Sequence, residues 1–142
     1  MREILFKGKR IDNGEWVEGC YAECNGKTFI GIDISIGIDD IFEVFCTLVI
    51  RWLEVDPETL CQFTGETDKN GKRIWESDVV WLVYDGKEHI YQIVWDNSEL
   101  DFKATNGEEN YGSNFEYLLC CDEIEVIGNI FDNPELLQEE HK

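Results

Sequence analysis

The chain has 142 residues, of which 43% are hydrophobic and 13% aromatic, so it can fill a hydrophobic core and does not belong to the disordered class. Its 31 acidic against 12 basic residues give a formal net charge of −19, which disfavours direct nucleic-acid binding. No segment approaches the ~18 apolar residues of a membrane span, and the N-terminus lacks the apolar region of a signal peptide. We therefore expect a cytoplasmic protein without membrane contact.

The acidic residues are unevenly distributed along the chain. From Asp96 to the C-terminus, 13 Asp and Glu stand against two basic residues, Lys103 and Lys142. This stretch is either a solvated face or a functional acidic face for a basic partner, and the sequence leaves both interpretations open.

Residues 15–23 and 28–34 are expected to form the first antiparallel hairpin. Asn25-Gly26 lies between them, and this dipeptide favours the tight turns that connect antiparallel strands. Similar turn signals recur at Asn13-Gly14, Asn70-Gly71, Asp85-Gly86 and Asn106-Gly107. The pattern predicts a mainly β, antiparallel fold.

Two short helices are expected, each beginning at one of the two prolines. Asp56-Pro57-Glu58 and Asn133-Pro134-Glu135 both offer an N-cap side chain, then a proline at the first helical position, then an acid. The first helix is expected to span a single turn, because Gln62-Phe63-Thr64-Gly65 follows it. No linker divides the chain, so one domain over residues 1–142 is expected, and a weak composition break near Asp56-Pro57 indicates lobes at 1–56 and 57–142.

Residues 78–96 form the clearest expected hairpin. Both sets of alternating side chains before Asp85-Gly86 are largely apolar, and residues 90–95 return as the second strand. Because both faces need cover, this hairpin is expected at the centre of a barrel or sandwich. Further strands are expected at 100–104 and 123–131, with either a helical turn or an irregular connection over 113–121.

The six cysteines are Cys20, Cys24, Cys46, Cys61, Cys120 and Cys121. Without an export signal, and often in apolar surroundings, they are expected to be reduced and largely buried. A zinc site needs closely spaced Cys or His ligands in two pairs, whereas this chain offers Cys20-x-x-x-Cys24 and the adjacent Cys120-Cys121. The second pair is poorly placed to chelate, because neighbouring strand residues point to opposite faces. No cofactor is expected.

Catalytic signatures are sparse in this sequence. Its two histidines are His89, beside an expected turn, and the penultimate His141, and neither stands in a recognised catalytic motif. Carboxylate pairs such as Asp39-Asp40, or Glu123 with Glu125, keep a carboxylate- or metal-dependent enzyme open as an alternative.

The loop that precedes the central hairpin is the candidate binding site. Its turn residues can satisfy backbone groups, and its glycines can adopt tight turn conformations, which favours a structural role. The loop is also polar and contains three cations in an acidic protein, and exposed loops on rigid scaffolds often carry function. A calcium loop of the EF-hand type is disfavoured, because Lys72 and Arg73 stand where such a loop needs an oxygen ligand followed by a glycine. The candidate residues are Thr64, Gly65, Asp68, Lys69, Asn70, Lys72 and Arg73.

The order of motifs resembles the YopX family of small phage and prophage proteins. The resemblance rests on an opening Met1-Arg2-Glu3-Ile4, Gly8-Lys9-Arg10 before Trp16, Gln62-Phe63-Thr64-Gly65, Asp68-Lys69-Asn70-Gly71-Lys72, Val126-Ile127-Gly128-Asn129-Ile130, and Asn133-Pro134-Glu135-Leu136-Leu137. Ser77 replaces the usual glycine, and Cys61 and Glu66 also depart from the pattern. A glycine at Ser77 could adopt a positive φ, which serine adopts only with strain. The resemblance implies one YopX-like domain with an SH3-like small barrel, an origin in a phage or prophage of a bacterium, and no catalytic residues.

Three functions are compatible with the sequence. The first is a noncatalytic interaction module that binds an unknown protein partner, and the second is an acidic DNA mimic acting on a host DNA-binding protein. The third is the carboxylate- or metal-dependent enzyme. Edge strands in a β-rich protein favour homo-oligomers, whereas the net charge opposes them, so the oligomeric state stays open.

Overall fold

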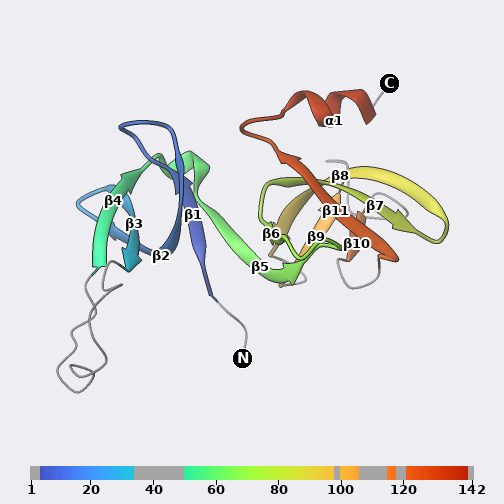
Figure 1. The fold of residues 1–142 in the computed structure, drawn as a ribbon, viewed down its shortest axis with the longest axis horizontal. Coiled ribbons are helices and arrows are strands. Elements are labelled where there is room, and N and C mark those ends of the chain that lie inside the picture. The colour runs from blue at the N-terminus through green and yellow to red at the C-terminus, as the bar shows by residue number, and fades with distance from the viewer. Residues whose placement is uncertain (1–3, 34–49, 98–99, 106–114, 118–120, 141–142) are drawn as a thin grey trace, which may run out of the picture. The chain divides into compact units, whose positions relative to one another are not determined.

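The computed structural model describes residues 4–33, 50–97, 100–105, 115–117 and 121–140 (Figure 1). The protein is mainly β and antiparallel, as predicted, and its strands belong to two compact units, Glu3–Gln62 and Phe63–Lys142. The description of one domain with lobes at 1–56 and 57–142 stays a prediction. Several sites named above lie outside the described residues, namely Asp39-Asp40, Cys46, Asn106-Gly107, Cys120 and His141.

The N-terminal unit is built on β1 (Phe6–Lys9), β2 (Trp16–Cys24), β3 (Lys27–Asp33), β4 (Ile50–Val55) and the first residues of β5 (Cys61–Thr67). These strands are hydrogen-bonded in the order β4-β3-β2-β1-β5. The predicted first hairpin is confirmed, with Cys24 opposite Lys27 across Asn25-Gly26. The buried apolar side chains of this unit are Ile30, Leu53, Val55 and Cys61.

Backbone contacts join the end of β1 to the end of β4. Arg10 forms an isolated bridge with Val55, and the amide of Asp56 donates to the Lys9 carbonyl at 2.8 Å. β1 approaches so closely here that a Cβ on Gly8 would lie 2.9 Å from Val55 Cγ2, which explains the glycine. The sheet of this unit therefore curls until its first and fourth strands meet.

The C-terminal unit contains β6 (Arg73–Trp75), β7 (Asp78–Tyr84), β8 (Lys87–Asp96), β9 (Asp101–Thr105), β10 (Phe115–Tyr117), β11 (Glu123–Asn129) and α1 (Glu135–Glu140). Five of these strands form a sheet in the order β10-β9-β8-β7-β11, while β6 pairs with β5. One face packs into a core cluster of Ile74, Val80, Leu82, Tyr91, Ile93, Phe102, Ala104 and Val126.

The predicted hairpin over residues 78–96 is confirmed as β7 and β8. Its turn residues Asp85 and Gly86 both have positive φ, 51° and 75°, which matches the twist of a two-residue hairpin turn. Val79 and Val80 point to opposite faces, and both are fully buried. The hairpin is thus buried on both faces at its start, whereas Trp81 and Val83 farther along one face are only partly buried, and α1 contacts β8.

Two fold predictions need correction. The described residues contain one α-helix, α1, because the Asp56-Pro57 start leads only into the 3-10 turn Pro57–Thr59, where Asp56 Oδ1 accepts from the Glu58 amide at 3.0 Å. A closed SH3-like barrel around the central hairpin is also not shown. The strands of the central hairpin belong to an open sheet, with β10 and β11 at its two edges.

The cysteines also differ from expectation. Cys61 is buried and Cys121 partly buried, but Cys20 and Cys24 are exposed on β2, and all four are free thiols. Alternate positions on β2 face outward, so cysteines four residues apart share the exposed face. Within the described part of the chain, no helix has the length and apolar character needed to cross a membrane.

Candidate functional site

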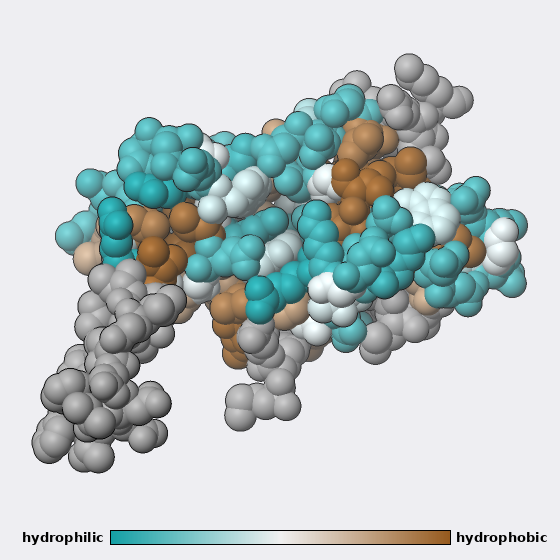
Figure 2. Space-filling model, in the orientation of Figure 1, coloured by the Kyte–Doolittle hydropathy of each residue, from teal (hydrophilic) through white to brown (hydrophobic). Residues whose placement is uncertain are grey.

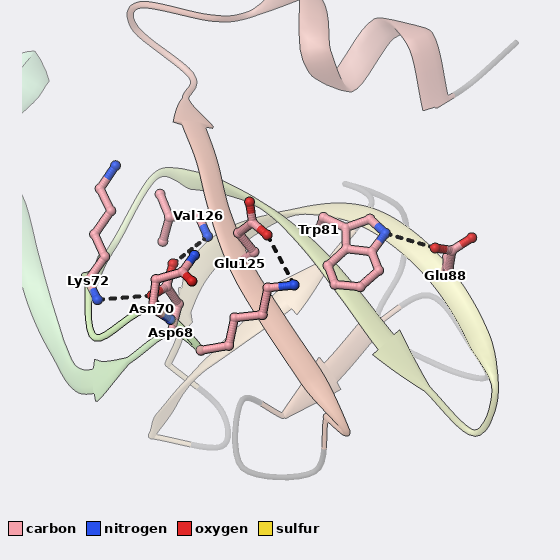
Figure 3. Close-up of polar contacts among 8 residues, drawn as sticks. Asp68, Asn70, Lys72, Trp81, Glu88, Glu125 and Val126 are labelled. Carbon is pink, nitrogen blue, oxygen red and sulfur yellow. Dashed lines mark hydrogen bonds and ion pairs between the residues drawn. The ribbon is translucent and has the colours of Figure 1, made fainter.

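Asp68 organises the candidate loop between β5 and β6. Its side chain is buried, and Oδ1 accepts from the backbone amides of Asn70 and Lys72, both at 2.9 Å. Oδ2 accepts from the amide of Val126 on β11, also at 2.9 Å (Figure 3). One carboxylate therefore closes the turn and fixes it to a strand that is distant in sequence.

Backbone hydrogen bonds complete this turn. The Asp68 amide donates to the Lys72 carbonyl at 2.7 Å, and the Gly71 amide donates to the Asp68 carbonyl at 2.9 Å. Gly71 has φ 81°, a left-handed conformation that glycine adopts without strain. The loop is thus a closed turn that holds its own shape.

The same loop covers the outer edge of β11. The Lys69 amide donates to the Ile124 carbonyl at 3.0 Å, and the Val126 amide is taken by Asp68. An uncovered edge strand offers free backbone groups to other chains. Asp68 and Lys69 occupy these groups at the middle of β11, which protects this edge of the sheet.

The carboxyl group of Asp68 is stabilised in its charged form. Burial works to raise its pKa, but the amides of Val126, Lys72 and Asn70, together with the Lys72 charge, outweigh burial, so the pKa lies below its usual value. A carboxylate that accepts several backbone hydrogen bonds commonly behaves this way. Asp68 is therefore an ionised anchor at neutral pH.

Beside the loop lies a surface that we call the Trp81 surface, made of Lys69, Trp81, Glu88 and Glu125. Lys69 Nζ lies 3.3 Å from Glu125 Oε1 and 4.9 Å from the centre of the Trp81 ring. The Trp81 indole nitrogen donates to Glu88 Oε1 at 3.2 Å (Figure 3). A cation over an indole face is attracted by the ring electrons, so Lys69 and Trp81 hold each other in place.

The other candidate residues divide into two groups. Thr64 is buried, and its hydroxyl donates to the Ile74 carbonyl at 2.7 Å and accepts from the Glu66 amide at 3.2 Å. Gly65 has φ 93°, so it provides a backbone conformation that other residues adopt only with strain. The exposed members are Lys69, Asn70, Lys72 and Arg73, and the Arg73 guanidinium lies 5.6 Å from the centre of the Phe63 ring.

The start of the central hairpin shows the strain expected at Ser77. This residue has φ 74°, and its backbone is fixed by bonds from its own amide to Ile93 and from the Ile130 amide to its carbonyl, at 2.8 and 3.0 Å. The neighbouring Asp78 is buried, and its Oδ2 accepts from the Trp75 amide at 2.8 Å. These hydrogen bonds hold the backbone of Ser77 in its left-handed conformation.

Comparison with known proteins identifies the family. A model of the YopX protein family matches residues 6–138, which is nearly the whole chain. The chain belongs to the YopX family. A similar fold is found in the crystal structure of protein EF1440 from Enterococcus faecalis, with a TM-score of 0.53 and 20% sequence identity over 96% of this chain and 99% of that one. No curated protein matches this YopX-family sequence.

The remaining candidates for chemistry in this YopX-family protein lie apart from one another. His89 stacks on Tyr91 at 4.8 Å between ring centres, while Glu125 is engaged by Lys69. Across the residues that the structure describes, no three His, Cys, Asp or Glu side chains gather in a metal-binding group.

Sequence reasoning did not place Trp81, Glu88 or Glu125 beside the loop. Glu125 lies opposite Trp81 in the β11–β7 ladder, and Glu88 lies two positions from Ile90, the residue that pairs with Trp81 on β8. The alternation in 78–84 puts Trp81 on one face, but only the register of β11 brings Glu125 to it. The signal for this surface is therefore long-range strand pairing.

Proposed function

We propose that this YopX-family protein is a noncatalytic protein-interaction module. The observation that carries the proposal is the loop anchored by Asp68, which holds Lys69 on the half-buried Trp81. A surface that is ordered before binding loses less conformational entropy when a partner docks. The Asp68 anchor gives this face of the sheet such an ordered surface.

The composition of the surface also suits protein recognition. Lys72 and Arg73 are exposed at the end of the loop that holds Lys69 over Trp81, in a protein of net charge −19. Tryptophan and arginine are enriched among the residues that dominate binding energies at protein interfaces. The partner that fits this surface carries acidic groups for the two cations and an apolar group for the indole.

Two finer proposals accompany this function. The joined ends of β1 and β4 favour an SH3-like small barrel in the N-terminal unit, instead of one around the central hairpin. Membership of the YopX family favours an origin in a phage or prophage and a site of action in the cytoplasm of a bacterial host. Within the described residues, nothing favours the acidic DNA mimic or the carboxylate enzyme over an interaction module.

The test is affinity purification of the full chain from bacterial lysate, with quantitative mass spectrometry of the retained proteins. Wild type is compared with the double variant Lys72→Glu/Arg73→Glu. Because the variant inverts both exposed cations, we expect it to lose the specific partners. Lys87→Glu is the matched control, since it inverts an exposed cation outside the loop, at the β7–β8 turn.

Retention of the same proteins by wild type and Lys87→Glu, and their loss from the double variant, is the supporting result. If all three proteins retain the same partners equally, Lys72 and Arg73 do not contribute to the binding surface. Wild type that retains no protein above background rejects the interaction module. Circular dichroism of each variant checks that a lost partner does not reflect lost folding.

A further inference from the structure

A second candidate surface lies in the N-terminal unit, at the edge of β4 that faces away from β3 (Figure 1). A cavity of about 360 Å³ opens here between β4 and the turn that follows β1. This volume lies within the range of small binding sites. The residues that line it are Arg10, Ile11, Asp12, Arg51, Trp52, Leu53 and Glu54.

The direction of the backbone groups on β4 follows from the neighbouring hairpin. Cys24 and Lys27 close the two-residue turn, so Lys27, Phe29 and Gly31 bond to β2, and the alternate residues of β3 bond to β4. These alternate residues are Thr28, Ile30 and Ile32, which pair with Val55, Leu53 and Arg51. The backbone N–H and C=O of Trp52 and Glu54 therefore point to the outer edge.

Only part of this edge is covered. The Ile11 amide donates to the Glu54 carbonyl at 3.1 Å, which occupies the outer edge at Glu54. Two residues earlier, Trp52 has no backbone bond on this side from any described residue. The edge of β11 is closed by Asp68 and Lys69, whereas the edge of β4 at Trp52 opens into the cavity.

Apolar side chains flank the open edge. Trp52 and Ile11 are 46% and 58% exposed, while the side chain of Leu53, on the opposite face of β4 from Trp52, is buried. The Trp52 ring packs over Gly31, where a Cβ would come within 2.8 Å of ring atom Cζ3. The ring is therefore supported from below and presents its other side to solvent.

Two arginines and two acidic residues, Asp12 and Glu54, line the cavity, and one of the arginines is available to a ligand. Arg10 is held by Asp12 through two hydrogen bonds, Nε to Oδ1 at 2.9 Å and Nη2 to Oδ2 at 2.6 Å. Arg51 is exposed and forms no ion pair within the described part of the chain. Arginine binds a carboxylate through two parallel hydrogen bonds, so Arg51 is suited to one acidic side chain.

We propose that the open edge of β4 binds an extended peptide segment of a partner protein, which adds as a further strand at Trp52. Neighbouring residues of a strand point to opposite faces, as Arg51 and Trp52 do. The bound segment accordingly places an acidic residue directly beside an apolar one, the first for Arg51 and the second for Trp52 and Ile11. Main-chain hydrogen bonds supply affinity and these two side chains supply selectivity.

The net charge selects among the occupants of this edge. A second copy of the chain would bring another charge of −19 against the first, and a strongly acidic segment is repelled for the same reason. A segment with a single acid among apolar and uncharged residues meets Arg51 without that repulsion. This proposal rests on the protein being an interaction module, but it uses a surface separate from the Asp68 loop.

The experiment selects random dodecapeptides displayed on phage against the immobilised full chain. Enriched peptides are then synthesised with a fluorophore, and their affinity is measured by anisotropy. We expect enriched sequences to contain an acidic residue next to an apolar one. Arg51→Glu and Trp52→Ala should each weaken binding at least about tenfold, whereas Lys72→Glu/Arg73→Glu should leave it unchanged.

Backbone methylation tests strand addition directly. Methylating successive peptide amides one at a time should abolish binding at alternate positions only, because every second amide of an added strand faces β4. Peptides that bind equally well to Arg51→Glu and Trp52→Ala would overturn the proposal, as would a failure to enrich any peptide. A dimer seen by light scattering and dissolved by Arg51→Glu would also overturn it, in favour of a second copy.

These outcomes are separate from the test of the Asp68 loop. Partners lost from Lys72→Glu/Arg73→Glu support the interaction module even when no peptide binds β4. Arg51 and Trp52 are exposed, so both variants are expected to fold, and thermal unfolding by circular dichroism checks this. Arg51→Lys is a second variant that keeps the charge but lacks the two-pronged geometry, and it should bind with intermediate affinity.

Discussion

The carboxylate of Asp68 accepts a hydrogen bond from the backbone amide of Val126, although 58 positions separate the two residues. This bond ties the loop before the central hairpin to β11, the strand that pairs with β7 of that hairpin. It also places Lys69 beside Trp81, because the Lys69 amide bonds to Ile124 on the same strand. The candidate surface therefore depends on one buried charge.

Asp68→Asn is expected to lower the free energy of unfolding by about 2–3 kcal/mol, since hydrogen bonds to a buried charged group are lost or weakened. An amide can still accept through its oxygen, but its NH₂ group faces an amide donor. Urea unfolding followed by circular dichroism measures the change. Asp85→Asn is the matched control at an exposed turn position with φ 51°, which asparagine tolerates. An equal loss in both variants would contradict the anchoring role of Asp68.

The contribution of Asp68 should depend on pH. Its pKa in the folded protein lies below the ordinary value of 3.8, so its stabilisation is complete well above pH 3.8 and is lost as pH falls through the lowered pKa. The difference in unfolding free energy between wild type and Asp68→Asn should therefore shrink on acidification. Urea titrations at pH 7, 5, 4 and 3 measure it, and the other titrating groups cancel in the difference. A difference that stays constant to pH 3 would show that the charge of Asp68 is not the stabilising feature.

Ser77→Gly is expected to stabilise the protein by about 0.5–1 kcal/mol, because relief of the left-handed serine outweighs the added chain entropy of glycine. The structure places Ser77 at φ 74°. Gly86→Ala is the reverse experiment, since Gly86 has φ 75° and open space where a Cβ would stand. Its stability should fall by about 1 kcal/mol. Thermal and urea unfolding measure both changes, and a destabilised Ser77→Gly would show that the serine side chain compensates its strain.

Local chemistry explains the parts of the fold that the sequence predicted. Asn25-Gly26 and Asp85-Gly86 specify tight turns, and alternation beside each turn defines its two strands, so both hairpins could be found without tertiary information. Asp56 likewise caps a turn through its nearest neighbours. That turn does not extend into a helix, because its residues lead directly into β5 and the pairing of β5 with β1 prevails.

Long-range pairing explains what the sequence did not predict. Strands β1, β4, β5, β6 and β10 have no expected counterpart above, and β1 pairs on one side with β2 but on the other with β5, far along the chain. The loop was selected from its turn residues, but its attachment to Val126 and its neighbour Trp81 depend on the register of β11. The exposure of Cys20 and Cys24 has the same origin, since it depends on which face of β2 meets the core.

Lys103→Met tests a buried ion pair beneath the sheet face opposite the main core. The side chain of Lys103 is fully buried on β9 and is paired with Asp96, whose side chain is 9% exposed. Removing the lysine leaves a nearly buried carboxylate without its partner, and such changes cost about 3–5 kcal/mol. Replacing both partners by apolar residues avoids the unpaired charge, so Lys103→Met/Asp96→Leu should recover most of this loss.

Urea unfolding of the wild type, both single variants and the double variant forms a complete cycle. The single variants should each lose stability, and the double variant should be more stable than either of them. This order follows because the cost of burying one charge alone exceeds the net benefit of the pair. A double variant whose loss equals the sum of the two single losses would show that Lys103 and Asp96 act independently, and the pair would then have no structural role.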